Sequence, residues 1–502
     1  MTAHCRSLAF HGVDTVAVDV QAQISPGLPA FSVVGLGDKA IAESRERVRA
    51  AIHALGLALP AKRLTVNLAP ADLSKEGSHF DLPIALALLM AMQVLPSDAT
   101  EGYIVMGELG LDGAILPVSG ILPAAMGAVA EDKGLICPEA NGAEAAWAGD
   151  INIIAAPHLL ALMNHLNGGQ LLPPPIRETR DDFRSGPDMR EIKGQETARR
   201  VLEITAAGGH NLLMSGPPGA GKSMLASCLP SILPSMSPAE MLEVSVIESV
   251  AGALSGGRLR RTRPFRDPHH SSSMAAMVGG GRRAQPGEIS LAHQGVLFLD
   301  ELPEFPRGVL EALRQPLETG QVSVARAQAH ITYPAEFQLI AAMNPCRCGY
   351  LTDSLRACNK APKCGKEYQS KLSGPLLDRI DLHIDVPEVP PAEIFGAPQG
   401  EPSAAVAERV AQARTIQTQR YQQLGIPITL NARLSGDHLY QQTLLEPAGQ
   451  TLLEEASAAL RLSMRGITRV LRVARTIADL SASETVQKSH LAESLSYRPQ
   501  LL

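Results

Sequence analysis

The stretch Asn211–Ser227, NLLMSGPPGAGKSMLAS, decides the fold, because its centre fits the pattern G-x-x-x-x-G-K-[ST]. The apolar run HNLLMSG predicts a strand before the loop, and KSMLASCL predicts a helix after it. In that context backbone N–H groups and the helix N-terminus hold phosphates, which argues against a chance glycine-rich turn. We expect Lys222 to bridge the terminal phosphates and Ser223 to ligate Mg²⁺. The predicted nucleotide-binding residues are Gly216, Pro217, Pro218, Gly219, Ala220, Gly221, Lys222 and Ser223.

A second motif, GVLFLDELPEF, begins at Gly295 and places four apolar residues before Asp300 and Glu301. A continuous apolar run of this length is typical of a buried parallel strand. At the end of that strand, Asp300 can hold the Mg²⁺ shell, and Glu301 can orient and deprotonate an attacking water. A surface acidic pair would not explain the apolar run. The sequence therefore predicts nucleotide hydrolysis rather than simple phosphoryl transfer.

Further polar residues fit a nucleotide hydrolase. The strand-like run FQLIAAMN ends at Asn344, where an amide can position water near the γ-phosphate. Arg379 lies among apolar residues in SGPLLDRIDLHIDV and can act as an arginine finger on a neighbouring subunit's ATP, with Asp378 and Asp381 as alternative partners. The stretch SMRGITRVLRVARTIADL predicts a helix, from which one arginine can reach the γ-phosphate, although a solvated face explains most of them equally well. Its arginines are Arg465, Arg469, Arg472 and Arg475.

The chain divides into three blocks around these motifs. Residues 1–165 alternate strand-like runs (TVAVDVQAQI, AFSVVGL) with helical ones (DKAIAESRERVRAAIHAL). Residues 166–188 mix Gly, Pro and charge without a hydrophobic period and are interpreted as a linker. Residues 189–390 alternate strands and helices around the phosphate loop, which predicts an α/β domain with a parallel sheet. Residues 391–502 are predicted to be helical.

Composition limits the function classes. A chain of 502 residues is expected to form two or three domains. The net charge of −6 and an aromatic content of 3% mean that nucleic-acid binding would need local basic patches. The N-terminus has no signal-peptide pattern, and the longest apolar stretch, LPIALALLMAMQVLP from Leu82, is read as a buried helix. We therefore expect a cytoplasmic protein with no membrane partner.

Together the motifs resemble a known family. IKGQETARRVLEITAAGGHNLLMSGPPGAGKSMLA, RPFRDPHHSSS, PGEISLAHQGVLFLDELPEF, AAMNPCRCG and LRVARTIADL are similar to the magnesium-chelatase-like AAA+ ATPases of the ComM/YifB family. The resemblance implies an AAA+ core with a C-terminal helical lid, and a ring, usually a hexamer, that hydrolyses ATP. By resemblance Asn344 is sensor 1, Arg379 the arginine finger and Arg465 the best candidate for sensor 2. It also implies a DNA helicase that drives branch migration when incoming single-stranded DNA recombines during natural transformation.

The N-terminal block resembles a second family. VMGELGLDGAILPVSGILPAAMGAVAEDKGLICPEAN is similar to the end of a Lon protease domain, a ribosomal S5 domain 2-like α+β fold. Where that family places its nucleophilic serine, the chain runs GSHFDLP, with Ser78 and His79 only nearby, and Leu122 stands at the lysine position. A Ser–Lys dyad needs both groups within hydrogen-bond reach. We interpret this block as a non-proteolytic scaffold for ring assembly or DNA threading.

Arginines gather between the two nucleotide motifs. GGRLRRTRPFR carries five of them between Arg258 and Arg266, and they are expected either to grip DNA phosphates or to pair with acids at subunit interfaces. Arg282 and Arg283 follow on a glycine-rich turn. GQVSVARAQAHITYPAEF predicts a β-hairpin with Arg326 and His330 near its tip. The glycine-rich turn with Arg282 and Arg283 and the hairpin with Arg326 and His330 are predicted to contact single-stranded or branched DNA.

Four of the seven cysteines crowd together as C-x-C-x₉-C-x₅-C. In a reducing compartment, Cys346, Cys348, Cys358 and Cys364 can form a structural Zn²⁺ site, because four thiolates suit that ion. The polar segment around them is too short to bury a core of its own, and a metal would supply the order. The spacing departs from the usual C-x₂-C knuckle. Cys5, Cys137 and Cys228 are read as isolated core residues.

The sequence is compatible with three functions. The leading hypothesis is an ATP-driven DNA motor that uses ATP and Mg²⁺. The first alternative keeps the ATPase but changes its client to a protein partner, as in a chelatase motor subunit. The second is an ATP-dependent protease, against which the missing dyad argues.

Overall fold

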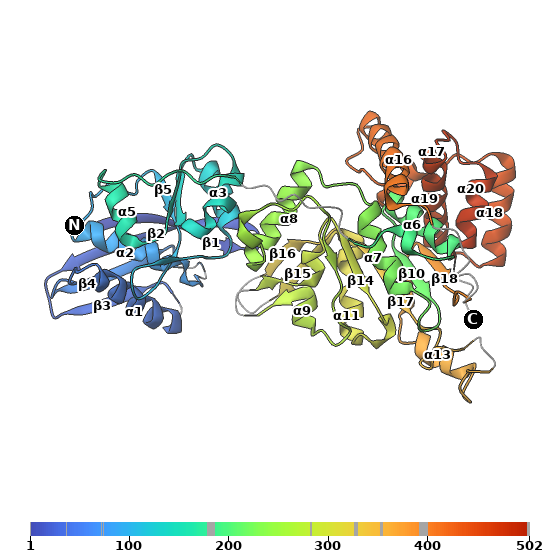
Figure 1. Cartoon of the computed structure of the whole chain (residues 1–502), viewed down its shortest axis with the longest axis horizontal. Helices are drawn as coiled ribbons and strands as arrows, with labels where there is room; N and C mark the ends of the chain where they lie inside the picture. Colours follow the sequence, from blue (N-terminus) through green and yellow to red (C-terminus); the bar gives the residue numbers. More distant parts are fainter. Residues whose placement is uncertain are drawn as a thin grey trace.

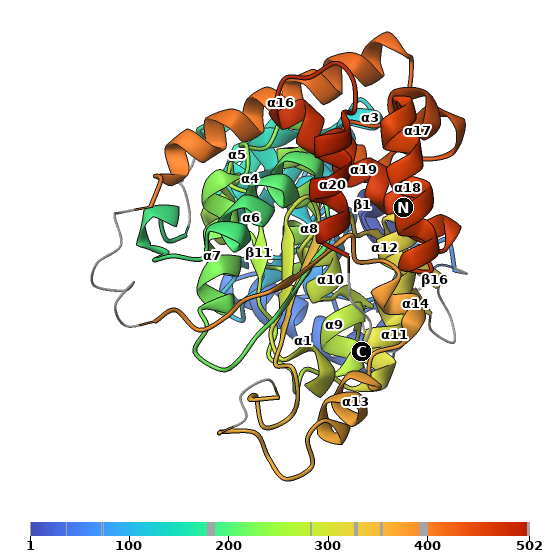
Figure 2. The same cartoon turned by 90° about the vertical axis from the view of Figure 1, so that its right-hand side faces the viewer.

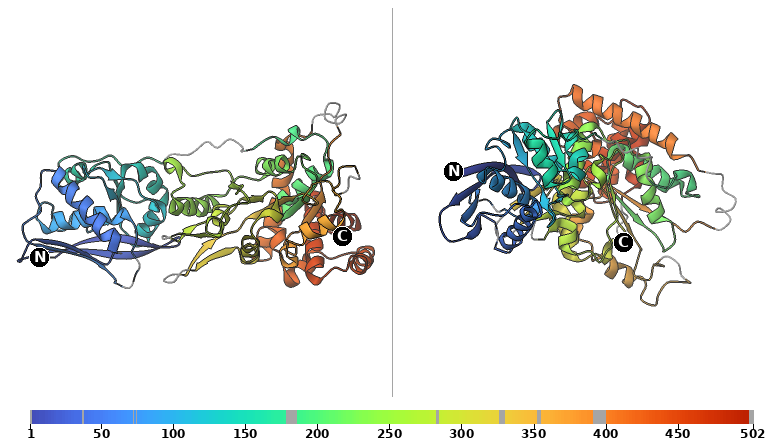
Figure 3. Two further views of the ribbon diagram at one scale, coloured as in Figure 1. Left: turned by 90° about the horizontal axis from the view of Figure 1, so that it is seen from below. Right: turned by 60° about the vertical axis from the view of Figure 1, so that its left-hand side comes forward.

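The computed structural model describes residues 2–36, 38–71, 73, 75–177, 186–281, 284–325, 330–351, 355–390 and 400–498. Three blocks follow one another along the longest axis, with the N-terminal block at one end and the C-terminal helices at the other (Figures 1 and 3). The mixed α/β architecture with a parallel sheet and a helical C-terminus confirms the predicted fold class. None of the described helices is long and apolar enough to cross a membrane.

The N-terminal block is built on a seven-stranded mixed sheet in the order β3-β4-β2-β1-β5-β8-β9. The apolar stretch predicted to be a buried helix forms α2, whose residues from Asp81 to Met90 are all buried against this sheet. The strands are β1 (Thr2–His11), β2 (Asp14–Ser25), β3 (Ala30–Val34), β4 (Arg63–Ala69), β5 (Tyr103–Val105), β8 (Gly134–Pro138) and β9 (Ile153–Ala156), with a small hairpin of β6 (Glu108–Leu109) and β7 (Ile115–Leu116). The helices are α1 (Asp38–Ala54), α2 (Asp81–Ala91), α3 (Ile121–Ala130), α4 (Gly142–Ala145) and α5 (Leu159–Leu166).

The central block has a five-stranded, wholly parallel sheet in the order β11-β14-β17-β10-β18. All residues of β14 and β17 are buried, as their continuous apolar runs predict for strands covered on both faces. The strands are β10 (Leu212–Ser215), β11 (Phe265–Arg266), β14 (Val296–Leu299), β17 (Gln338–Met343) and β18 (Leu382–Asp385). The helices are α6 (Glu196–Gly208), α7 (Lys222–Ile232), α8 (Pro238–Ala251), α9 (Met274–Val278), α10 (Glu288–Leu291), α11 (Arg307–Ala312), α12 (Arg314–Thr319), α13 (Lys363–Gln369) and α14 (Gly374–Leu377).

Two antiparallel hairpins extend this block. β12 (Gly279–Gly280) pairs with β13 (Gln285–Pro286), and β15 (Gln321–Ala325) pairs with β16 (His330–Pro334), as predicted for the segment before Asn344. Arg282, Arg283 and Arg326 lie outside the described residues. His330 begins β16, and its side chain is not described.

The C-terminal block is helical, as predicted, and packs on helices of the central block. We call these C-terminal helices the lid. Long α16 (Ser403–Gln423) contacts α6, α7 and α19, and α19 also contacts α6. In Figure 2 these helices face the viewer. The remaining elements are η7 (Asn431–Arg433), α17 (Gly436–Gln442), α18 (Pro447–Ala459), α19 (Met464–Leu480) and α20 (Lys488–Ser496).

The N-terminal block docks on α8 through buried contacts. Leu122, at the expected lysine position, clusters with Val246 and Leu259. The buried Glu144 carboxylate accepts hydrogen bonds from the Ser249 hydroxyl and the Leu122 amide, and burial raises its pKa. Ser78 donates to Glu108, and His79 is buried with its Nε2 3.0 Å from the Leu8 carbonyl.

Candidate nucleotide site

The phosphate loop joins β10 to α7 at the carboxyl edge of the parallel sheet. Gly219 and Gly221 have φ of +80° and +87°, which glycine adopts without strain, and a Cβ at either would meet nothing within 4 Å. A Cβ on Gly216 would lie 2.1 Å from the Val386 carbonyl, so only glycine fits beside the end of β18. The loop is therefore closely packed at its base and open where phosphates would approach.

Lys222 folds back into the loop. Its Nζ donates to the carbonyls of Gly216 at 2.8 Å and Pro217 at 2.9 Å, and to Asn344 Oδ1 at 3.2 Å. Burial lowers the pKa of Lys222, and the carboxylates of Asp300 and Glu301 oppose that shift. The structure thus brings the lysine of the first motif and the asparagine of the third into direct contact.

Ser223 and Asp300 also meet. The Ser223 hydroxyl donates to Asp300 Oδ2 at 2.6 Å, and Asp300 Oδ1 accepts from the backbone N–H of Glu301 at 2.8 Å. Hydroxyl and carboxylate oxygens are the ligands that Mg²⁺ prefers. A further acid, Asp267, lies near Asp300. Partial burial and the neighbouring Asp300 carboxylate raise the pKa of Asp267. These residues fit a Mg²⁺ ion that is shared with bound phosphates.

Glu301 stands at the open side of the site. It has a left-handed φ of +51°, uncommon for a residue other than glycine, and its side chain is 48% exposed. His270 Nδ1 lies 3.3 Å from Glu301 Oε2, and the His270 ring packs against His269 and, edge-on, against Phe305. Sequence reasoning missed His270, because the two-residue strand β11 before it is too short to be recognised from a pattern.

Arg379 and Arg465 lie on the other edge of the sheet. Arg379 lies shortly before β18, which begins at Leu382. β18 runs parallel to β10, and the phosphate loop follows the opposite end of β10. Four strand residues span roughly 13 Å at about 3.3 Å each. Both arginines line a cavity of about 1140 Å³ together with residues at the strand starts, among them Asn211 and Gln338. The residues of the phosphate loop do not line this cavity, and the sensor 2 role of Arg465 stays a prediction.

The Arg379 guanidinium has partners that the sequence did not indicate. It donates to Glu318 Oε2 and to the Pro375 carbonyl, each at 2.6 Å. The hydrogen bond from Arg379 lowers the pKa of Glu318. The two acids expected as alternative partners, Asp378 and Asp381, instead lie beside Arg469, at 3.8 and 3.7 Å.

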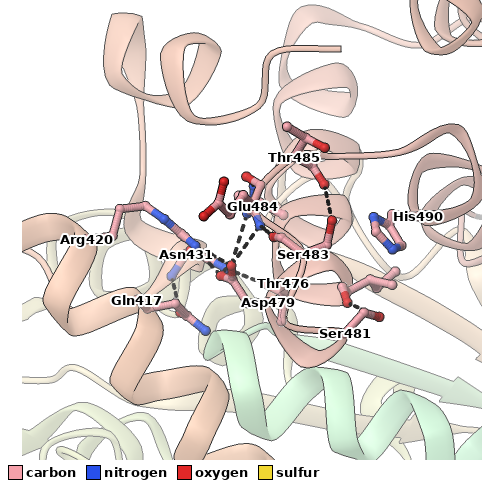
Figure 4. A network of polar contacts seen from close by, with 12 residues as sticks. Gln417, Arg420, Asn431, Thr476, Asp479, Ser481, Ser483, Glu484, Thr485 and His490 are labelled. Carbon is pink, nitrogen blue, oxygen red and sulfur yellow. Dashed lines mark hydrogen bonds and ion pairs between the residues drawn. The ribbon is translucent and has the colours of Figure 1, made fainter. Parts of the chain in front are cut away.

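The other arginines of α19 hold the lid together. Arg472 donates to the Leu434 carbonyl at 2.6 Å, and Arg475 is buried. Figure 4 shows the network around Asp479, in which Arg420 and Asn431 donate hydrogen bonds to the carboxylate. Arg475 Nε donates to the same carboxylate at 3.1 Å. Three of the four α19 arginines thus have intrachain partners, whereas Arg465 is exposed.

The basic segment before Asp300 is largely paired within the chain. Arg263 lies 2.8 Å from Glu240, Arg266 binds both oxygens of Glu288 at 2.6 and 2.7 Å, and Arg260 lies 3.9 Å from Glu248. Three of these arginines therefore pair with acids of their own chain, and the alternative in which they pair with acids at subunit interfaces stays a prediction.

The cysteine segment brings thiols together. The ligand atoms of Cys346, Cys348 and Cys364 all lie within 4.8 Å of one another, and Cys346 Sγ is 3.0 Å from Cys348 Sγ. Cys358 lies outside that group of three, but its thiol interacts with those of Cys348 and Cys364. The Cys346 thiol lowers the pKa of Cys348, which favours the thiolate that a metal needs. The donor set fits Zn²⁺ with at least three sulfur ligands.

Comparisons with known proteins agree with this geometry. Residues 188–394 match the model of magnesium chelatase, subunit ChlI, residues 400–498 match its C-terminal model, and residues 20–141 match subunit ChlI of Mg-chelatase. The chain is 44% identical to the uncharacterized protein YifB of Salmonella typhimurium over 97% of this chain and 95% of the relative. It is 43% identical to the competence protein ComM of Haemophilus influenzae, over 98% and 96%. The magnesium-chelatase 38 kDa subunit of Rhodobacter capsulatus is 29% identical over 31% of this chain and 49% of that subunit. The chain belongs to the magnesium-chelatase-like family of AAA+ ATPases that includes YifB and ComM.

Proposed function

We propose that this protein is an ATP-driven motor that hydrolyses ATP with Mg²⁺ and moves DNA. The observation that carries the ATPase is the convergence of Lys222, Ser223, Asp300, Glu301 and Asn344 at one edge of the sheet. Lys222 and the loop amides hold the phosphates, and Ser223 and Asp300 hold Mg²⁺. Glu301 deprotonates the attacking water, and Asn344 positions that water.

The motor works as a ring, for which a hexamer is the expected state. The support is the placement of Arg379 and Arg465 at the edge opposite their own phosphate loop, so that they complete a neighbouring chain's site. Arg379 then acts as the finger in trans, and Arg465 takes the sensor 2 role in trans as well. We keep the division of the chain near residues 165, 189 and 391, with a non-proteolytic Lon-like first block, as part of this proposal.

DNA is proposed as the client because a relative of nearly equal length is named a competence protein. Branch migration during recombination of incoming DNA in natural transformation is the activity we propose. Arg282, Arg283, Arg326 and His330 are the proposed DNA contacts, and the first three lie outside the described residues. The second candidate is an ATPase that remodels a protein partner, which the match to magnesium-chelatase subunits favours.

One experiment separates these functions. ATP turnover is measured with and without single-stranded and branched DNA, and unwinding of a four-way junction is followed with the wild type and the Glu301→Gln variant. The motor predicts DNA-stimulated turnover and unwinding by the wild type alone. Turnover that ignores every DNA would overturn the DNA client and leave the protein-remodelling ATPase.

We further propose one structural Zn²⁺ per chain at Cys346, Cys348, Cys358 and Cys364. Its support is the close approach of the thiols. Metal analysis of the purified full chain tests it, with one equivalent of zinc as the expected result. A metal-free, fully folded and active protein would show that these are ordinary thiols.

A further inference from the structure

The cysteines lie on a segment that touches the nucleotide site at several points. We call residues 345–351 and 355–373 the thiol arm. Its helix α13 projects from the body of the central block in Figures 1 and 2. Despite that projection, both ends of the arm return to elements that carry the proposed catalytic residues.

The first contact is with the phosphate loop itself. A Cβ on Gly349 would lie 2.5 Å from Cδ and 2.6 Å from Cγ of Pro218, so the arm's backbone rests directly on the loop. Gly349 also has a φ of +86°. Any larger residue there would have to push Pro218 away.

The second contact is with the strand that ends in Asn344. The Gln369 side chain, at the end of α13, donates from Nε2 to the Pro345 carbonyl at 3.1 Å. Pro345 follows Asn344, which accepts the hydrogen bond from Lys222. Two hydrogen bonds, Gln369 to Pro345 and Lys222 to Asn344, thus connect α13 to the lysine that would hold the phosphates.

The third contact is with the acidic segment after Asp300. Lys371 Nζ lies 3.3 Å from both carboxylate oxygens of Glu304, which ends the short helix η6 (Leu302–Glu304) directly after Glu301. The same ammonium lies 5.1 Å from the centre of the Tyr368 ring, and Tyr368 is only 4% exposed. The arm therefore contacts both motifs that make the nucleotide site.

The thiols link the two halves of the arm. Cys346 and Cys348 lie between Asn344 and Gly349, whereas Cys364 lies on α13 with Gln369 and Tyr368. The buried apolar side chains of the described arm are few: Cys346, Cys364, Tyr368 and Leu372. With so little apolar cover, a metal that binds sulfurs from both halves supplies most of the order.

We propose that the metal in the thiol arm braces the nucleotide site, so that ATP affinity depends on metal occupancy. This inference rests on the proposed ATP and zinc sites. Metal binding fixes Gly349 against Pro218 and Gln369 against Pro345. Loss of the metal releases both contacts while the sheet and the lid stay folded, because Leu372 is the one described arm residue in the cores of the sheet and none lies in the core of the lid.

The first test uses the full chain and a fluorescent ATP analogue with excess Mg²⁺. Zinc is removed with a chelator, its content is measured, and Zn²⁺ alone is then added back. We expect the metal-free chain to bind the analogue roughly three- to tenfold more weakly, the worth of about one hydrogen bond, and Zn²⁺ to restore the affinity. Cys364→Ser should reproduce the loss, and Cys137→Ser, in β8 far from the arm, should not.

A second variant tests the mechanical link without touching a thiol. Gly349→Ala should keep its zinc and still bind the analogue more weakly, because the new Cβ displaces Pro218. Gly425→Ala is the matched control: its φ is also left-handed, at +65°, but its Cβ meets nothing within 4 Å. We expect Gly425→Ala to bind like the wild type.

The outcomes separate this inference from the proposals beneath it. Equal affinity of the zinc-loaded and zinc-free chains would overturn the brace and leave the ATP and zinc sites standing. A chain that never binds zinc would overturn the zinc site together with the brace. Failure of the zinc-loaded wild type to bind the analogue would refute the nucleotide site itself. Hydrogen exchange of α19 in each sample checks that the lid remains folded.

Discussion

At the scale of single residues, Lys222 shows how a buried charge is held at the phosphate loop. Its ammonium is bonded by two loop carbonyls and by Asn344, so the buried charge keeps hydrogen-bond partners. A bound phosphate would exchange these partners for stronger, charge-assisted ones. The lysine is thus held in the loop by partners that a phosphate can replace.

Replacement of Lys222 should remove nucleotide binding. Lys222→Ala deletes the cation that bridges the phosphates and frees Asn344, and we expect the affinity for ATP to fall by at least two orders of magnitude, about 3 kcal/mol or more. Equilibrium binding of a fluorescent ATP analogue measures this. A variant that binds like the wild type would contradict the assignment of the loop.

Glu301→Gln should behave differently, because it removes a base and no phosphate contact. We expect ATP to bind with nearly unchanged affinity, and turnover to fall by roughly 10²- to 10⁴-fold, the usual worth of general base catalysis. Single-turnover hydrolysis with a chased label separates the two steps. Normal turnover by this variant would remove Glu301 from the mechanism.

At the scale of elements, the lid depends on the charge network around Asp479. The carboxylate is fully buried and accepts from two guanidinium groups and one amide. Such a site stabilises only while it is complete, because a lone buried charge is costly. The network therefore fixes α16 and α19 relative to each other.

Asp479→Ala should destabilise the lid by about 3–5 kcal/mol, because it leaves Arg420 and Arg475 without their shared counter-charge. Native-state hydrogen exchange of α19 measures the loss. Ser481→Ala is the control, since Ser481 is exposed and only its hydroxyl bond to the Ile477 carbonyl is lost. Its effect should stay within about 0.5 kcal/mol. A similar effect of both variants would show that the network adds nothing.

The elements also show what sequence alone can predict. The phosphate loop, β14, β17 and the β15–β16 hairpin follow from local patterns, since apolar runs and turn residues act over a few positions. The partner of Arg379 does not follow, because Glu318 is 61 residues away. The contact between His270 and Glu301 is likewise made by the fold and not by spacing.

At the scale of the whole molecule, the two edges of the central sheet carry different halves of the proposed site. We expect Arg379→Ala to bind ATP almost normally and to hydrolyse it roughly 10³- to 10⁵-fold more slowly, as for other trans-acting arginines. Mixing it with Lys222→Ala should restore part of the activity, because a mixed ring contains composite sites with both groups intact. Loss of ATP binding without rescue would make Arg379 a structural residue.

Dilution gives a second measure of the same arrangement. Because the proposed site takes its two halves from different chains, the turnover per chain should fall when the protein is diluted below its assembly concentration. In the Glu301→Gln protein, the residues that bind the phosphates all come from one chain. Its affinity for the ATP analogue should therefore depend less on dilution. Sedimentation at the same protein concentrations measures the fraction of chains that are assembled in rings. Constant turnover per chain through dissociation would exclude a composite site.

The pairing of Arg379 with Glu318 has a consequence for how the proposed ring would open. If Arg379 is the finger of the proposed ring, an isolated subunit keeps this guanidinium paired with an acid of its own, so its free face carries no unpaired cation at that point. When one subunit interface of the ring opens, Arg379 exchanges the neighbour's phosphate for the Glu318 carboxylate and is not left unpaired. The electrostatic barrier to opening therefore stays low. A ring that encircles a DNA strand without free ends needs a subunit interface that can open and close. The Glu318 carboxylate would hold the Arg379 side chain in place until that interface closes again.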